Sequence, residues 1–164
     1  MKVYIFRHGH AESKALAPGK TDEGRRMVPE GKEQVRWTCE RAKEFGLAPS
    51  VIMSSPRVRG RETAVMAKDI LNPKAEVLAH SCLEPEAKVG ETYKALAKLN
   101  SGDSVILVTH LPHLGHLIAD MLDWESVWQN LDFENGAMAR IDFKGPPKPR
   151  KGSLVWLISP TRSG

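Results

Sequence analysis

The chain has 164 residues and a formal net charge of +4, with 24 Lys and Arg against 20 Asp and Glu. This length fits one domain with its own core, and 41% hydrophobic with 27% charged residues is a globular rather than a disordered composition. No apolar run approaches the roughly 20 residues that span a bilayer, and the N-terminal apolar run is too short for a signal peptide. Two distant cysteines, Cys39 and Cys82, favour a cytoplasmic protein without a disulfide framework or a cysteine metal site.

Short β-branched runs alternate with stretches of helical spacing along the chain. In chain order the pattern predicts a strand over Lys2–Phe6, a helix from Pro29 to near Gly46, a strand over Val51–Met53, a helix over Arg61–Leu71, a weak strand over Glu76–Leu78, a helix over Glu91–Leu99, a strand over Ser104–Thr109, a helix over His113–Leu122, and two strands over Ala137–Phe143 and Ser153–Ile158. This alternation predicts a single domain over 1–164, an α/β fold built as a three-layer α/β/α sandwich with a mostly parallel central sheet.

Arginine and histidine gather directly after three of the predicted strands, within Arg7–His10, Ser54–Arg59 and Thr109–His113. In open parallel sheets, ligands bind beyond the carboxyl ends of the strands, so these side chains are expected to meet. Arginine presents a planar fork of donors that suits phosphate oxygens, and histidine can donate a hydrogen bond or act as a nucleophile. Each tripeptide alone is a weak signal, but their joint placement predicts an anion site that accounts for the basic surplus.

The same three segments carry a resemblance to a known family. Arg7-His8-Gly9 after the first strand resembles the signature of the histidine phosphatase superfamily, whose fold is phosphoglycerate mutase-like. Ser54-Ser55-Pro56 followed by Arg59 and Thr63 resembles that family's second phosphate-binding segment. The segment Thr109-His110-Leu111-Pro112 and the short chain resemble those of the SixA-type phosphohistidine phosphatases. The resemblance extends from Lys2 to about Ser159.

The resemblance implies a role for each matching residue. His8 would be the nucleophile that takes the phosphoryl group, and Arg7 and Arg59 would hold the non-bridging oxygens, with His110 donating from the other side. Gly9 would let the backbone approach the phosphate without a Cβ in the way. No metal or organic cofactor is implied, because side chains supply the positive charge.

Two neighbouring residues leave alternatives open. Arg57 is a candidate substrate contact, although its position two residues before Arg59 suggests a solvated side chain that points elsewhere. Ser55 could donate to phosphate or cap the turn before Pro56. The extra histidines are interpreted as rim or structural residues: His10, His113 and His116.

The general acid is where the chain departs from the wider superfamily, many members of which place a glutamate in a loop to protonate an alcohol leaving group. The matching region contains Glu84, the preferred candidate, and Glu86, the second, and both could be solvated loop charges. SixA-type members often lack a clear acid, which an imidazole leaving group that already carries a proton would tolerate.

Further departures point to the substrate. Mutase-like members usually carry an asparagine where Lys14 stands, and a long segment that closes over the substrate, which this sequence does not show. The resulting open site suits phosphohistidine on a partner protein, such as a component of a phosphorelay; the alternative is a phosphomonoesterase for a small metabolite or nucleotide. A non-catalytic phosphate-binding module has no support, because Arg7, His8, Arg59 and His110 are all present.

Neither nucleic acid nor a membrane is expected as a partner. The chain has no run of five or more basic residues, and few aromatic residues lie among its Lys and Arg. A basic loop containing Lys144, Lys148, Arg150 and Lys151 has no assigned role.

Overall fold

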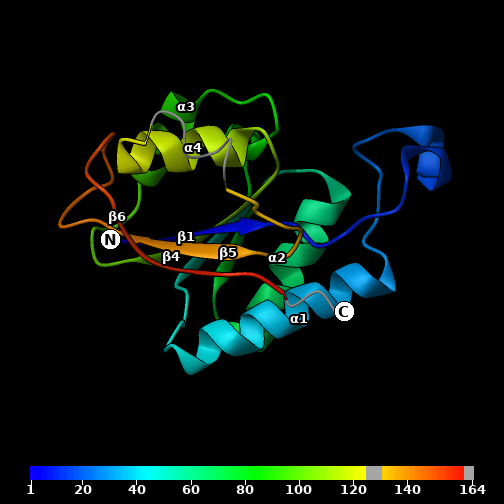
Figure 1. The fold of residues 1–164 in the computed structure, drawn as a ribbon, viewed down its shortest axis with the longest axis horizontal. Helices are drawn as coiled ribbons and strands as arrows, with labels where there is room; N and C mark the ends of the chain where they lie inside the picture. Colours follow the sequence, from blue (N-terminus) through cyan, green and yellow to red (C-terminus); the bar gives the residue numbers. More distant parts are fainter. Residues whose placement is uncertain (125–130, 161–164) are drawn as a thin grey trace.

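The computed structural model describes residues 1–124 and 131–160; residues 125–130 and 161–164, which the expected domain also includes, lie outside the described residues. Within them, one six-stranded sheet has the strand order β3-β2-β4-β1-β5-β6 (Figure 1). The strands are β1 (Lys2–Arg7), β2 (Val51–Ser54), β3 (Glu76–Ala79), β4 (Ser104–Thr109), β5 (Met138–Asp142) and β6 (Ser153–Ile158). The pairs β3–β2, β2–β4 and β4–β1 are parallel, and β5 is antiparallel to both of its neighbours. The expected mostly parallel sheet is confirmed.

Helices cover both faces of this sheet, which confirms the three-layer arrangement. Figure 1 shows α1 and α2 on one side and α3 and α4 on the other. The α-helices are α1 (Pro29–Glu44), α2 (Val58–Leu71), α3 (Val89–Leu96) and α4 (His113–Leu122), and short 3-10 turns are η1 (Lys14–Leu16), η2 (Pro18–Lys20) and η3 (Ser81–Leu83). None of the described helices is long and apolar enough to cross a membrane.

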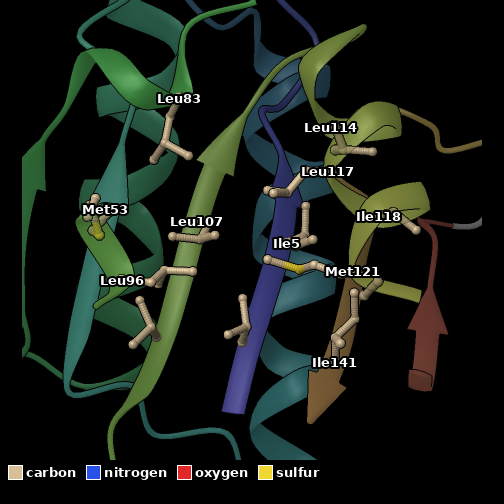
Figure 2. Close-up of a cluster of buried hydrophobic side chains, with 14 of the residues drawn as sticks. Ile5, Met53, Leu83, Leu96, Leu107, Leu114, Leu117, Ile118, Met121 and Ile141 are labelled. Carbon is tan, nitrogen blue, oxygen red and sulfur yellow. The ribbon is translucent and has the colours of Figure 1, made fainter. Parts of the chain in front are cut away.

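Two hydrophobic clusters, one on each face, explain why the central strands are apolar without alternation. In β1, Val3 and Ile5 belong to the cluster under α3 and α4, whereas Tyr4 and Phe6 belong to the cluster under α1 and α2. Figure 2 shows the first cluster, with side chains of α4 pointing toward Ile5. Each fully buried large aliphatic side chain contributes about 1.5–3 kcal/mol, so the two layers fix the sheet that carries the site.

The bounds of two helices, α2 and α3, differ from the sequence prediction. The helix expected from Arg61 begins at Val58, and the helix expected over Glu91–Leu99 spans Val89–Leu96. Gly60, a poor helix former, lies in the first turn of α2 because a Cβ there would come within 2.9 Å of the Ser55 hydroxyl oxygen. Close packing of the turn therefore requires glycine where propensity alone predicts a loop.

The parallel register brings the three arginine- and histidine-bearing segments to one edge. Arg7 of β1 is paired with Thr109 of β4, and Ser54 of β2 is paired with Val108 of β4. The next residues leave the sheet side by side: the His8 amide donates to the Thr109 carbonyl at 3.3 Å, and the Ser55 amide to the Val108 carbonyl at 3.1 Å. The three segments therefore meet at the carboxyl ends of their strands, as the sequence predicts.

Candidate active site

A cavity of about 430 Å³ opens at this edge of the sheet. Its walls come from the segments after β1 and β2, from the loop that precedes α1, and from the loops before α3 and α4. The lining residues are Arg7, His8, His10, Ala11, Asp22, Arg25, Arg57, Arg59, Pro85, Glu86, Leu111, Pro112 and Asn135. Four arginines and two histidines give the cavity the composition of an anion site.

His8 is buried at the base of the cavity with one ring nitrogen fixed. Its Nδ1 lies 2.8 Å from the Gly9 carbonyl, which can only accept, so Nδ1 carries the proton and Nε2 is bare. Arg59 donates from Nε toward that Nε2 over 3.3 Å. Burial lowers the pKa of His8 to about 3, the Gly9 carbonyl opposes this shift, and the positive charge of Arg59 reinforces it. The imidazole is therefore uncharged at neutral pH.

Gly9 has a structural reason for lacking a side chain. A Cβ at this position would lie 2.4 Å from the carbonyl oxygen of Gly31 in α1, and the Gly9 amide donates to Thr63 Oγ1 at 3.2 Å. Thr63 Oγ1 in turn donates to the Arg59 carbonyl at 2.8 Å. The structure thus gives Gly9 a packing role, because the glycine admits α1 and its amide ties the His8 loop to α2. That Gly9 also makes room for a phosphate stays a prediction.

Arg7 is held by a segment that the sequence reasoning missed. Its Nη1 donates to the Phe133 carbonyl at 2.7 Å, and its buried Nε has no hydrogen-bond partner among the described residues. The neighbouring Asn135 donates from Nδ2 to the His8 carbonyl at 3.1 Å and lines the cavity. Nothing in the local sequence around Asn135 signals this contact, because it depends on the turn that leads into β5.

Arg57 and Arg59 both reach the cavity, from the start of α2. Arg59 is 4% exposed, and its Nη1 donates to the Asp22 carbonyl at 2.7 Å. Arg57 donates from Nε to Glu84 at 2.5 Å and from Nη1 to the carboxylate of Asp22. The suggestion that Arg57 points elsewhere is corrected: Arg57 precedes the helix as its N-cap with extended backbone, and there two residues of separation do not impose opposite directions.

His110 lies beside His8 and is oriented by Ser55. The two imidazole centroids are 4.7 Å apart, and His110 Nε2 shares a hydrogen bond with Ser55 Oγ at 2.5 Å. Ser55 Oγ also accepts from the Arg57 amide at 3.3 Å, as the turn-capping alternative expects. The buried Nδ1 of His110 has no partner among residues 1–124 and 131–160. Neither Ser55 nor His110 is among the residues that line the cavity; His110 lies beside the lining residue His8, and Ser55 reaches the site through its hydrogen bond to His110.

The two candidate acids occupy different positions. Glu84 accepts from Arg57 and is not part of the cavity lining, whereas Glu86 lines the cavity. The geometry therefore favours Glu86 over the first-choice Glu84 as the carboxyl group that meets a ligand.

The structure also places two of the extra histidines. His10 lines the cavity at its rim, whereas His113 is buried, with its Nδ1 3.0 Å from the Ala87 carbonyl oxygen.

The loop before α1 adds two charged residues that the sequence reasoning did not select. Asp22 accepts from Arg25 Nη1 at 2.9 Å and from Arg59 Nη2 at 3.0 Å. Both Asp22 and Arg25 line the cavity. Their spacing of three residues is visible in the sequence, but such pairs are common on exposed surfaces and carry no site signal alone.

Comparisons with known proteins agree with this geometry. The chain is 29% identical to the phosphohistidine phosphatase SixA of Escherichia coli, over 98% of this chain and 94% of that protein. A solved structure of the protein histidine phosphatase SixA with tungstate is 27% identical and superposes with a TM-score of 0.84 over 98% of this chain and 97% of that chain. A putative SixA structure from Agrobacterium tumefaciens, 23% identical, has the same fold, with a TM-score of 0.78 over 98% of both chains. No family model matches the chain.

The fold and the arginine–histidine cavity are those of a phosphoryl-transfer enzyme, and the chain belongs to the histidine phosphatase superfamily. Within that superfamily it is a homologue of the SixA phosphohistidine phosphatases. It is accordingly a histidine phosphatase.

Proposed function

We propose that the chain hydrolyses phosphohistidine on a partner protein without a metal ion, with His8 as the nucleophile. The observation that carries the proposal is the bare Nε2 of a buried, uncharged His8 beside Arg59 in an arginine-lined cavity. Arg7, Arg59 and His110 contact the phosphoryl oxygens, and Asn135 and Thr63 hold the loop that carries His8.

The first step transfers the phosphoryl group to His8. Nε2 attacks phosphorus in line, a new N–P bond forms, and the N–P bond of the substrate breaks with its electron pair passing to the departing imidazole. That imidazole leaves neutral because its other nitrogen already carries a proton. The Gly9 carbonyl stabilises the positive charge that develops on His8 by accepting from Nδ1.

The second step returns His8 to its starting state. Water attacks phosphorus, the bond to Nε2 breaks, inorganic phosphate forms and one water proton passes to solvent. In the proposed mechanism the Ser55 hydroxyl, which accepts from the Arg57 amide, donates its own proton to His110 Nε2, and His110 then carries its proton on Nδ1. His110 Nδ1 and Arg7 Nε, both buried and unpartnered among the described residues, are then donors for the charged phosphoryl oxygens.

The positive charge of the lining side chains supports metal independence. Arg7, Arg57 and Arg59 line the cavity with three guanidinium groups, which neutralise a phosphoryl group as a divalent ion does in other phosphotransfer enzymes. Proteins rather than small molecules are the proposed substrates because the relative from Escherichia coli is named a phosphohistidine phosphatase.

A substrate panel tests the proposal. With EDTA present, we expect kcat/KM on a phosphohistidine-bearing protein to exceed that on small phosphate esters by about 10²-fold or more, because remote contacts of a large substrate contribute binding energy. Activity that disappears with EDTA and returns with added Mg²⁺ or Zn²⁺ contradicts metal independence. A preference for esters contradicts the protein substrate and supports the phosphomonoesterase alternative.

The position of Glu86 in the cavity wall favours the phosphomonoesterase alternative, because a carboxyl group there can protonate an alkoxide or phenoxide leaving group. We expect Glu86→Gln to lower kcat on phenyl phosphate by about 10²-fold, and on phosphohistidine by less than about threefold, because imidazole needs no added proton.

The matched comparison for this variant is p-nitrophenyl phosphate, whose leaving group needs little protonation. Glu84→Gln serves as the matched variant, because Glu84 contacts Arg57 and does not line the cavity. Equal losses on all three substrates for Glu86→Gln would remove Glu86 as the acid, and a leaving-group-dependent loss for Glu84→Gln would restore the first-choice candidate.

A further inference from the structure

The carboxylate of Asp22 contacts both arginines at the start of α2, Arg57 and Arg59. We propose that the Asp22 carboxylate holds the position of a phosphoryl oxygen on Arg57 and Arg59, and that it exchanges with the phosphoryl group during binding and release. This inference rests on the phosphoryl-binding role proposed for the cavity. It makes Asp22 a determinant of oxyanion affinity in this site.

Three guanidinium groups converge on this one carboxylate. Asp22 Oδ2 accepts from Arg57 Nη1 and, at 3.0 Å, from Arg59 Nη2, while Oδ1 accepts from Arg25 Nη1 at 2.9 Å. Arg59 also reaches His8 Nε2 with its Nε, over 3.3 Å. Before attack, the phosphorus atom must lie about 3–3.5 Å from His8 Nε2. The guanidinium group of Arg59 contacts both this Nε2 and the Asp22 carboxylate, so it is close to both the nucleophile and the carboxylate.

Both arginines have anchors that do not involve the Asp22 carboxylate. Arg59 Nη1 donates to the backbone carbonyl of Asp22 at 2.7 Å, and Arg57 Nε donates to Glu84 at 2.5 Å. Loss of the Asp22 carboxylate therefore leaves Arg57 and Arg59 positioned, with Nη1 of Arg57 and Nη2 of Arg59 free to bind an oxyanion. The carboxylate acts as a competitor for these two donors more than as their support.

Charge and exposure make the exchange feasible. Partial burial alone would raise the pKa of Asp22, but hydrogen bonds from Arg25 and Arg59 and the charge of Arg57 hold that pKa far below its ordinary value, so Asp22 is ionised at neutral pH. Its side chain is 34% exposed, which leaves a path into solvent. A phosphoryl dianion carries more charge than the carboxylate and displaces it; as phosphate departs, the carboxylate returns to the arginines.

Direct binding of inorganic phosphate tests the exchange. By isothermal titration calorimetry we expect Asp22→Asn and Asp22→Ala to bind phosphate about tenfold more tightly than the wild type, because a charged competitor has been removed from the arginines. Stronger product inhibition by phosphate and a lower kcat are expected in steady state, since release then limits turnover. Circular dichroism establishes that each variant is folded.

The matched control is Glu12→Gln, which removes one negative charge from the same loop, where Glu12 accepts from the Arg26 amide at 3.0 Å. We expect its phosphate affinity to stay within about twofold of the wild type, because within residues 1–124 and 131–160 the Glu12 side chain bonds to the Arg26 amide and makes no hydrogen bond or ion pair with Arg57 or Arg59. Unchanged or weaker phosphate binding by both Asp22 variants would overturn the exchange and make Asp22 a support for the arginines. Absence of phosphate binding in the wild type and the Asp22 variants alike would instead contradict the proposed phosphoryl site itself.

Discussion

The His8→Ala variant is expected to lose about 10⁴-fold or more in kcat on a phosphohistidine-bearing protein, because it removes the atom that accepts the phosphoryl group in the proposed mechanism. The fold should survive, since the hydrogen bonds of the His8 ring among the described residues go to the Gly9 carbonyl and to Arg59, and its other ring contact is with His110 in the same cavity region. Steady-state kinetics measures the loss, and thermal unfolding followed by circular dichroism measures the fold.

The matched control is His80→Ala, which removes a histidine that accepts from the Cys82 amide and does not line the cavity. Its kcat should stay within about threefold of the wild type, in the range expected for a change that is remote from the reacting atoms. A folded His8→Ala protein with more than a tenth of the wild-type activity would remove His8 as the nucleophile.

The Arg59→Ala variant is expected to lower kcat/KM by about 10³-fold, because it removes a buried charge beside His8 that, in the proposed mechanism, holds the phosphoryl oxygens. Arg59→Lys should recover only part of this loss, since a single ammonium group cannot reproduce the planar fork that reaches His8 and Asp22 together. Steady-state measurement of kcat/KM for both variants and the wild type on the same substrate tests this expectation.

Arg61→Ala is the matched arginine control, two residues further along α2, where the side chain is exposed. We expect its kcat/KM to remain within about twofold of the wild type, as for other exposed single charges. Equal losses in the Arg59 and Arg61 variants would mean that the helix contributes only a general positive field, and the specific contact of Arg59 with the phosphoryl group would be wrong.

The fold could be predicted largely from the sequence because the two central strands, β4 and β1, are buried on both faces. Runs such as Val105–Val108 have no polar alternation, and the flanking segments have helical spacing, so the layers follow from the pattern alone. The site edge followed as well, because His8 and His110 directly succeed neighbouring parallel strands. What failed were details of packing, such as the start of α2, where Gly60 is required by the nearby Ser55.

Contacts that depend on loops could not be predicted. Asp22 reaches Arg57 across 35 residues, and Arg7 is held by Phe133 across 126 residues, distances along the chain at which no spacing rule operates. The choice between Glu84 and Glu86 likewise turns on which carboxyl group Arg57 binds, a feature of the folded loop. Local sequence therefore identifies the residues that follow strands and misses those that loops deliver.

The phosphohistidine form of His8 is the species on which the mechanism depends most directly. Wild-type protein is mixed with a phosphohistidine-bearing protein, quenched in denaturant at alkaline pH within milliseconds, and digested for peptide mass spectrometry. We expect one acid-labile phosphoryl group on the peptide that contains His8, rising and then decaying within a single turnover, and none in His8→Ala. Complete turnover with the phosphoryl group on another residue, or with no labelled enzyme at any time, would contradict the mechanism.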